Sequence, residues 1–232
     1  MLLTTPFDTV IFDLDGTVCD SAPGILASLD HAFTDTGLTP PPDLVRFIGP
    51  PFQTAFGREG FSPAEVELLL KSYRAHYWEL GAFMSTIYPG MADLLGQLGA
   101  EGYRVAIATS KPEPTARRIL EHFGLTSQFE VIGGATFDMG RATKAEVLGY
   151  VLDQLHNCLP VMVGDRYHDV QGAAEFQIPC IGVNWGYGGH QELLDAGARW
   201  IVDRAEQIYD IVHRKLRIPM NEYRPLIEFT AQ

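Results

Sequence analysis

From Tyr103 onward the chain alternates short β-branched runs with longer segments of helical periodicity, and this alternation constrains the fold more than any other feature. Five runs predict strands, at Arg104 to Thr109, Glu130 to Ile132, Val161 to Gly164, Cys180 to Asn184 and Trp200 to Val202. Helices are predicted at residues 113–123, 144–155, 170–176, 190–196 and 205–216. Because strands that alternate with helices form parallel sheets covered on both faces, the sequence predicts an α/β fold with a doubly wound parallel sheet.

Another apolar run, Val10 to Phe12, predicts a strand that ends at two carboxylates, Asp13 and Asp15. Two unit charges about 4 Å apart repel by roughly 4 kcal/mol at an effective dielectric of about 20, so a cation, a proton or open water must relieve them. Ligands of open α/β sheets bind beyond the carboxyl ends of the strands. The acidic pair therefore indicates a metal site at that edge of the sheet.

The segment between about Ser21 and Phe83 loses the short β-type runs and shows helical periodicity. Its clearest helix begins at Ser62, with Pro63 in the first turn and Glu65 three residues after the cap. Pro89 and Gly90 break the pattern before a further helix over residues 91–101. We expect a core domain of residues 1–19 and 86–232, interrupted by a helical insertion of residues 20–85.

Polar residues follow other predicted strands at the same edge: Thr109-Ser110-Lys111, then Lys144 at a helix start, and Asp165 and Asp169 after the strand at 161–164. If these strands are neighbours, Asp13, Asp15 and Asp165 supply the oxygen ligands that Mg²⁺ prefers. Thr109 and Ser110 offer donors to phosphate oxygens. Lys144 offsets the repulsion between an attacking carboxylate and a phosphate dianion.

The one-residue spacing of the acidic pair permits two different chemical roles. One acid can attack phosphorus and form an aspartyl phosphate, while the other protonates the leaving oxygen and later takes a proton from water. Such a division suits phosphate monoesters, whose uncatalysed hydrolysis is among the slowest known reactions.

In this order and spacing, the residues resemble the motifs of the haloacid dehalogenase (HAD) superfamily of phosphotransferases. Asp13-Leu14-Asp15-Gly16-Thr17 resembles the first motif, Thr109 with Ser110 the second, Lys144 the third, and Gly164-Asp165 with Asp169 the fourth. The resemblance covers nearly the whole chain, and residues 20–85 look like the small helical cap of that superfamily. It implies a Rossmann-like core and a phosphatase.

The resemblance also implies a role for each residue. Asp13 would be the nucleophile, Asp15 the acid/base, Thr109 a phosphate ligand and Lys144 the charge neutraliser. Mg²⁺ would be held by Asp13, the backbone carbonyl of Asp15 and Asp165, while Asp169 would support Lys144 or a metal-bound water. Further phosphate or substrate contacts are expected from Gly16, Thr17, Ser110, Lys111 and, if the insertion closes over the core, Arg46.

A narrower resemblance links the chain to the phosphoglycolate phosphatase and 5′-nucleotidase-like branch. It rests on Ile48-Gly49-Pro50-Pro51, Thr109-Ser110-Lys111-Pro112, Gly164-Asp165-Arg166 and the loop Gly182 to Gly189. We therefore expect a small phosphorylated metabolite as substrate, phosphoglycolate first, with a nucleoside monophosphate as the alternative.

Other classes use similar residues. A sugar phosphomutase would pass the phosphoryl group to a sugar hydroxyl instead of water. A receiver-type switch also uses acids, Mg²⁺, Thr and Lys, but its phosphorylated aspartate follows a later strand, whereas the run Glu130 to Ile132 ends here in Gly133-Gly134. A dehalogenase is disfavoured because the second acid, Asp15, is a feature of phosphoryl transfer.

Composition limits the partners. With 29 acidic and 17 basic residues the net charge is -12, which argues against binding to a nucleic-acid polymer or an anionic membrane. Nowhere do eighteen apolar residues run together, so we expect a cytoplasmic protein. We also expect a monomer or a homodimer. We further expect His168 on the surface, Asp169 as an alternative helix cap and residues 182–189 as a mobile loop beside the site.

Overall fold

The computed structural model of the chain describes residues 7–49, 52–138 and 140–213. Its centre is a sheet of six parallel strands in the order β5-β4-β1-β6-β7-β8. The strands are β1 (Thr9–Phe12), β4 (Arg104–Pro112), β5 (Val131–Ala135), β6 (Pro160–Gly164), β7 (Cys180–Val183) and β8 (Trp200–Val202). Because β1 pairs with both β4 and β6, the loops that follow these three strands meet at one edge of the sheet.

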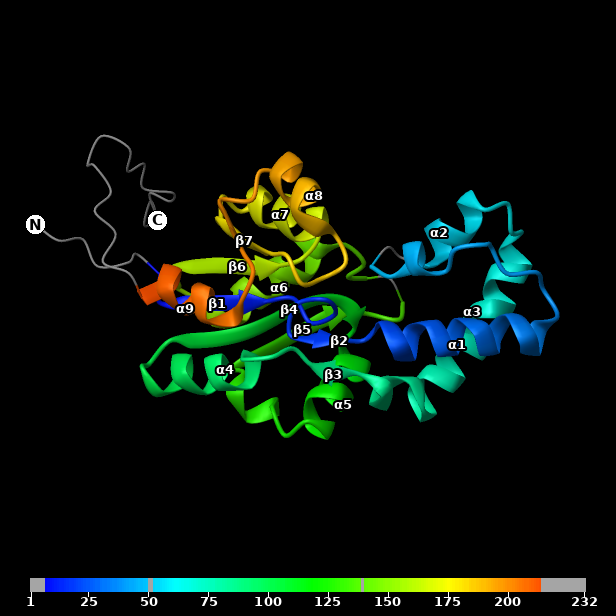
Figure 1. The fold of residues 1–232 in the computed structure, drawn as a ribbon, viewed down its shortest axis with the longest axis horizontal. Coiled ribbons are helices and arrows are strands. Elements are labelled where there is room, and N and C mark those ends of the chain that lie inside the picture. Colours follow the sequence, from blue (N-terminus) through cyan, green and yellow to red (C-terminus); the bar gives the residue numbers. More distant parts are fainter. Residues whose placement is uncertain (1–6, 50–51, 139, 214–232) are drawn as a thin grey trace, which may run out of the picture.

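Helices cover both faces of this sheet (Figure 1). One face carries α4 (Met91–Ala100), α5 (Glu113–His122) and α9 (Ala205–His213), and the other carries α6 (Lys144–Leu155), α7 (Tyr167–Glu175) and α8 (Gly189–Ala196). Side chains alternate along β1, so that Val10 and Phe12 join the core beneath α4 while Ile11 joins the core beneath α6. The predicted doubly wound α/β fold is confirmed.

The helical insertion lies beyond the carboxyl ends of the strands (Figure 1). It contains α1 (Ala22–Thr36), η1 (Val45–Phe47), α2 (Phe52–Arg58), α3 (Pro63–Glu79) and η2 (Gly81–Met84). A short antiparallel ribbon of β2 (Cys19–Asp20) and β3 (Thr86–Ile87) joins it to the core. The proposed boundary at 19/20 falls within β2 and the one at 85/86 lies directly before β3, and this division into domains stays a prediction.

The start of α3 follows the predicted capping pattern. Ser62 Oγ accepts a hydrogen bond from the Glu65 backbone N–H, and the Glu65 carboxylate accepts one from the Ser62 backbone N–H. Val66, Leu69 and Tyr73 on the same helix are buried against the rest of the insertion. The local cap and the apolar stripe therefore fix where this helix begins and which face it buries.

Strand β5 corrects one sequence-based boundary. The strand runs through Gly133 and Gly134 to Ala135, so the glycines do not end it. A Cβ atom at Gly134 would lie 2.6 Å from the carbonyl oxygen of Lys111, so glycine lets β5 pass close to the end of β4. Helix α9 is described as far as His213, and its predicted end at 216 lies outside the described residues, as do Pro50 and Pro51.

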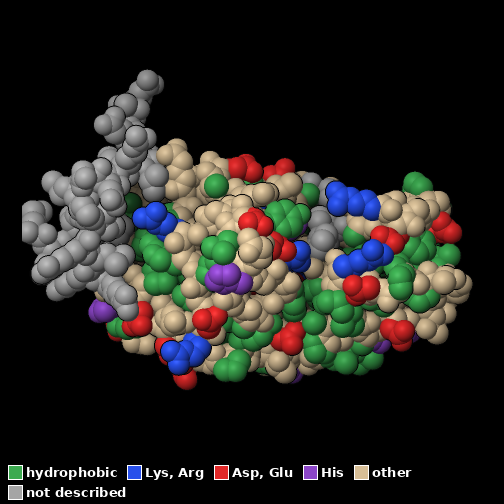
Figure 2. Space-filling model, turned by 45° about the horizontal axis from the view of Figure 1, so that its top comes forward, with side chains coloured by type: hydrophobic (Ala, Val, Ile, Leu, Met, Phe, Trp, Pro, Cys, Tyr) green, Lys and Arg blue, Asp and Glu red, His purple; other side chains and the backbone are tan. Residues whose placement is uncertain are grey.

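The exposed charges are mixed in sign. On the face drawn in Figure 2, basic side chains lie in small groups next to acidic ones. Ion pairs such as Arg104 with Glu130 and Arg117 with Glu113 illustrate this local compensation. Among the described helices, none combines the length and apolar character needed to span a bilayer.

Candidate active site

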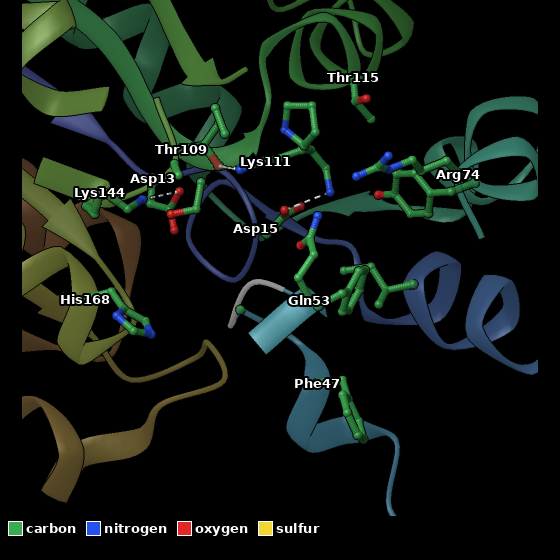
Figure 3. A pocket seen from close by; sticks show the side chains of 18 of the residues that line it. Asp13, Asp15, Phe47, Gln53, Arg74, Thr109, Lys111, Thr115, Lys144 and His168 are labelled. Atoms are coloured by element: carbon green, nitrogen blue, oxygen red, sulfur yellow. Dashed lines mark hydrogen bonds and ion pairs between the residues drawn. The ribbon is translucent and has the colours of Figure 1, made fainter. Parts of the chain in front are cut away.

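The loop after β1 separates the two acids of the first motif. Asp13 continues the strand, because its N–H donates to the Val163 carbonyl oxygen of β6 at 2.9 Å. The chain then turns through Gly16, whose φ of 84° lies in the left-handed region that suits glycine. As a result Asp13 and Asp15 turn toward different partners (Figure 3).

Asp13 pairs with Lys144 at the first position of α6. Lys144 Nζ lies 2.8 Å from Asp13 Oδ1 and 2.8 Å from Asp169 Oδ1, and it donates to the Ala108 carbonyl oxygen at 2.8 Å. Lys144 and Asp169 are buried, and Asp13 is 8% exposed. The lysine is thus held by two carboxylates from two different loops of the sheet edge.

Asp169 satisfies both sequence-based interpretations. One of its oxygens, Oδ2, accepts a hydrogen bond from the Arg166 backbone N–H at 3.0 Å, which is a helix-capping contact at the start of α7. The other, Oδ1, pairs with Lys144. Capping and support of the lysine therefore belong to the same carboxylate.

Asp165 is fully buried in a closely fitted cradle. Thr17 Oγ1 donates to Asp165 Oδ1 at 3.0 Å, and the Tyr187 backbone N–H donates to Asp165 Oδ2 at 2.8 Å. A Cβ atom at Gly16 would lie 2.3 Å from Asp165 Oδ2, and one at Gly186 would lie 2.2 Å from the Asp165 Cβ. Both glycines are therefore required by the space that the carboxylate occupies.

Burial shifts the pKa values of the acids that share this edge of the sheet. Burial raises the pKa of Asp13 to about 6; the nearby Lys144 lowers it and Asp169 raises it. Burial, with Asp169 and Asp13 nearby, also raises the pKa of Asp165 well above its usual range. For Lys144 burial acts to lower the pKa, but the two carboxylates outweigh it and the pKa is raised.

The donor set fits a hard divalent cation. One carboxylate oxygen from each of Asp13, Asp165 and Asp169 lies within 4.8 Å of the others, and all three residues are buried. Lys144 offsets only one of the three negative charges. The remaining negative charge and the all-oxygen set of donors suit Mg²⁺.

The Asp15 carboxylate belongs to a different set of contacts. Asp15 Oδ2 lies 2.8 Å from Lys111 Nζ, and this lysine also lies 4.6 Å from the centre of the Tyr77 ring in the insertion. Asp15 Oδ1 is buried without a hydrogen-bond partner among the described residues. Asp15 was predicted to help hold the metal, but its side chain does not join the three-aspartate group; a contact through its backbone carbonyl stays a prediction.

A cavity of about 210 Å³ connects these groups to the insertion. Asp13, Asp15, Thr109, Ser110 and Lys144 line its core side. Thr109 is buried and its Oγ1 accepts a hydrogen bond from the Lys111 N–H at 3.2 Å, while Ser110 is half-buried. The structure thus brings the proposed nucleophile, acid/base and phosphate ligands into one cavity, although their roles stay predictions.

Three predicted substrate contacts lie elsewhere. Arg46 forms an ion pair with Glu59 within the insertion and does not line the cavity. Gly16 and Thr17 also do not line the cavity, because Gly16 packs against Asp165 and Thr17 donates a hydrogen bond to it. Lys111 does line the cavity, but in this state its charge is engaged by Asp15.

One further expectation is corrected. His168 is half-buried, lines the cavity and contacts Tyr167 in a tilted arrangement with the ring centres 3.7 Å apart, so it faces the site and not the open surface. The reason is that α7 begins at Tyr167, which turns its first residues toward the site. In the loop 182–189, Trp185 Nε1 donates to the Thr17 carbonyl oxygen at 3.1 Å, and Tyr187 donates to both the Asp165 and the Asp20 carboxylates. The mobility of this loop stays a prediction.

Sequence reasoning also missed Arg166 as a link to the insertion. Its Nη1 donates to the Ile48 carbonyl oxygen at 2.8 Å, and its Nε lies 2.8 Å from Glu192 Oε1. Arg74 of α3, which lines the far side of the cavity, was likewise not singled out. Arg74 stands in an amphipathic helix whose pattern carries no sign of a cavity, so only the fold could reveal it.

The family comparison agrees with this geometry. Residues 10–183, more than half of the chain, match the model of the haloacid dehalogenase-like hydrolase family. The chain belongs to this family. The matched range includes the first, second, third and fourth motifs, and with them the residues that converge at the sheet edge.

Two curated relatives and one solved structure are similar to this HAD-like hydrolase over most of its length. Tyrosine-protein kinase PtkA of Mycobacterium tuberculosis is 44% identical over 207 residues, covering 87% of this chain and 70% of the kinase. The 5′-nucleotidase of Pseudomonas aeruginosa is 36% identical over 195 residues, covering 81% of this chain and 87% of the nucleotidase. The crystal structure of a predicted phosphatase from Clostridium acetobutylicum superposes with a TM-score of 0.82 at 35% identity, covering 88% and 97% of the two chains.

These similarities confirm the enzyme class predicted from the sequence. The chain is a phosphoric monoester hydrolase of the HAD-like family. The fold and the order of the motifs agree with that assignment.

Proposed function

We propose that this hydrolase is a Mg²⁺-dependent phosphatase that cleaves the monoester of a small metabolite through an aspartyl phosphate on Asp13. The observation that carries the proposal is the contact of Asp13 with Lys144 beside Asp165 and Asp169. A nucleophilic carboxylate needs a neighbouring cation when it approaches a phosphate dianion, and this site supplies one lysine and a place for a second cation.

The proposed metal would be held by Asp13 and Asp165, with Asp169 as the third acid of the group. Thr17 and Tyr187 orient Asp165 for this contact. When bound, Mg²⁺ would neutralise charge on the phosphate oxygens. The protein residues would perform the steps of bond making, bond breaking and proton transfer.

In the first step an Asp13 carboxylate oxygen attacks phosphorus and the bond to the ester oxygen breaks. Asp15 gives its proton to the departing oxygen, and Oδ1 is suited to carry that proton because Oδ2 is already paired with Lys111. In the second step Asp15 takes a proton from water, the water oxygen attacks phosphorus, and the bond to Asp13 breaks. Inorganic phosphate leaves and both acids return to their initial states.

A phosphate-release screen tests this proposal. The purified chain is assayed with phosphoglycolate, nucleoside monophosphates and sugar phosphates, in Mg²⁺ and in EDTA. We expect release with at least one class in Mg²⁺ and loss of that release in EDTA. The sequence resemblance favours phosphoglycolate, with a nucleoside monophosphate as the alternative, and this screen decides between them.

The variant Asp13→Asn tests the covalent step. Asparagine keeps the shape of the side chain, and Lys144 retains its pair with Asp169, so the fold is expected to persist. Turnover should fall by at least about 10³-fold because the nucleophile is lost. Thermal unfolding checks the fold, and sustained phosphate release by a folded Asp13→Asn protein would rule out this mechanism.

A second candidate function is phosphoryl transfer to a tyrosine hydroxyl, because the 44% identical relative from M. tuberculosis is named a tyrosine-protein kinase. A labelling assay, run beside the phosphate-release screen, separates the two functions. Transfer of label from [γ-³²P]ATP to protein tyrosine, without release of free phosphate from any monoester, would favour the kinase. Interconversion of hexose phosphates without free phosphate would favour a mutase.

A further inference from the structure

The wall of the cavity opposite the reactive carboxylates consists mainly of aromatic rings. Its members are Phe47, Phe52, Tyr73, Tyr77 and Trp78 from the insertion and Phe137 from the core. Phe52 and Tyr73 pack edge to face with ring centres 4.7 Å apart, and Tyr73 and Tyr77 stack at 5.5 Å. Because these three rings hold one another in place, this part of the aromatic wall is formed before any ligand enters.

The reactive groups and the aromatic wall lie at two ends of the same cavity. In Figure 3, Asp13 and Lys144 lie at one end and Arg74 at the other, with the pair of Asp15 and Lys111 between them. A substrate whose phosphorus is placed for attack by Asp13 would therefore have its ester oxygen near Asp15. The remainder of the leaving group would extend toward Arg74 and the rings.

The cation at the far end of the cavity, Arg74, stands beside an aromatic ring. Lys111 is already paired with Asp15. Arg74 has no carboxylate within ion-pair distance among the described residues, and its guanidinium lies 5.8 Å from the centre of the Phe137 ring. A guanidinium beside aromatic faces provides a planar surface on which another ring can stack, with N–H donors at its edge.

We propose that the leaving group of the substrate carries a planar aromatic ring, which is buried between the aromatic wall and Arg74. This inference rests on the proposed phosphatase function. Two classes of monoester share this chemistry, namely aryl phosphates such as phosphotyrosine and nucleoside 5′-monophosphates. Phosphoglycolate has a small charged leaving group that would leave the rings unfilled.

Non-hydrolysable phosphonates test the preference without the bias of leaving-group reactivity. Benzylphosphonate and butylphosphonate are compared as ligands of the Mg²⁺-loaded full chain, by thermal shift and by inhibition of phosphate release. We expect benzylphosphonate to bind at least about 10-fold more tightly. Equal binding of the two phosphonates, or tighter binding of phosphonoacetate, would overturn the inference.

Two cavity residues with substantial exposure provide the matched variants. Trp78 and Phe137 are 36% and 53% exposed, so Trp78→Leu and Phe137→Leu are expected to fold. Each should reduce the preference for benzylphosphonate by about 3- to 10-fold while leaving the affinity for butylphosphonate unchanged. Leu159→Ala is the control, because Leu159, at 58%, is about as exposed as Phe137 but precedes β6 at the opposite edge of the sheet.

Rates of hydrolysis show which class of monoester supplies the aromatic ring. Faster hydrolysis of phosphotyrosine than of adenosine and uridine monophosphates assigns the site to aryl phosphates, and the reverse assigns it to nucleotides; either supports the inference. Release of phosphate from sugar phosphates with no aromatic preference would refute the inference and leave the phosphatase function intact. If no monoester is hydrolysed while benzylphosphonate still binds more tightly, the proposed function fails and the aromatic site remains.

Discussion

Replacement of Thr17 by valine removes one hydrogen bond from a fully buried carboxylate and changes almost nothing else. Asp165 has two protein donors, Thr17 Oγ1 at 3.0 Å and the Tyr187 N–H at 2.8 Å. A hydrogen bond to a charged group contributes roughly 1.5–3 kcal/mol. We therefore expect Thr17→Val to lower the free energy of unfolding by about 2 kcal/mol, or the melting temperature by about 4–8 °C for a chain of this size.

The same variant should weaken metal binding, because loss of a contact that orients a metal ligand typically costs about 10–100-fold in affinity. Urea denaturation in EDTA measures the stability, and thermal stabilisation by added Mg²⁺ measures the affinity. Thr17→Ser is the control, since serine keeps the hydroxyl and loses one methyl group worth about 1 kcal/mol. A role of the Thr17 hydroxyl in positioning Asp165 is ruled out if Thr17→Val has the same free energy of unfolding and the same Mg²⁺ affinity as the unmodified chain. It is also ruled out if Thr17→Ser weakens Mg²⁺ binding as strongly as Thr17→Val.

Three further outcomes follow from the packing. Lys144→Met should lower the free energy of unfolding by about 3–5 kcal/mol in EDTA, because two buried carboxylates lose their cation; a loss below about 1 kcal/mol in urea denaturation would contradict this. Gly134→Ala should cost about 1–3 kcal/mol through its clash with the end of β4, whereas Gly96→Ala, with no atom within 4 Å in mid-helix, should be neutral or stabilising. Burial and the neighbouring His31 lower the pKa of His76, so the unfolded state takes up the proton more readily than the folded state. The stability that His76 contributes above pH 6.5 should therefore decline as the pH falls toward 5. Urea denaturation at several pH values measures this dependence, and His76→Gln should remove its share of the slope of the unfolding free energy against pH.

The order of elements and most of the reactive residues could be read from local patterns. Helix α6 occupies the predicted residues 144–155, and the capping pair Ser62 and Glu65 starts α3 as expected. Asp13, Thr109 and Lys144 could be placed together because parallel strands deliver their carboxyl ends to one edge of the sheet. Each of these inferences needs only periodicity, a cap, or a general rule of sheet topology.

Contacts between distant segments could not be read in this way. Thr17 was expected to bind phosphate, but it donates to Asp165, which is 148 residues away in the sequence. Arg46 was expected to reach the substrate, but Glu59 engages it. Both side chains have several possible partners of opposite charge or complementary polarity, and the choice depends on how the insertion and the loops close over the sheet.

Two acids at the end of β1, with a lysine and two further aspartates on later loops at the same edge of the sheet, follow from local sequence alone. Residue type and spacing are sufficient for that, because strand geometry converts them directly into position. The pairing of Asp13 with Lys144 and of Asp15 with Lys111, and the aromatic rings on the opposite wall, emerge only in the folded chain. Those outcomes arise from packing between the insertion and the core, where the identity of a neighbour is set by the folded chain and not by the residues on either side.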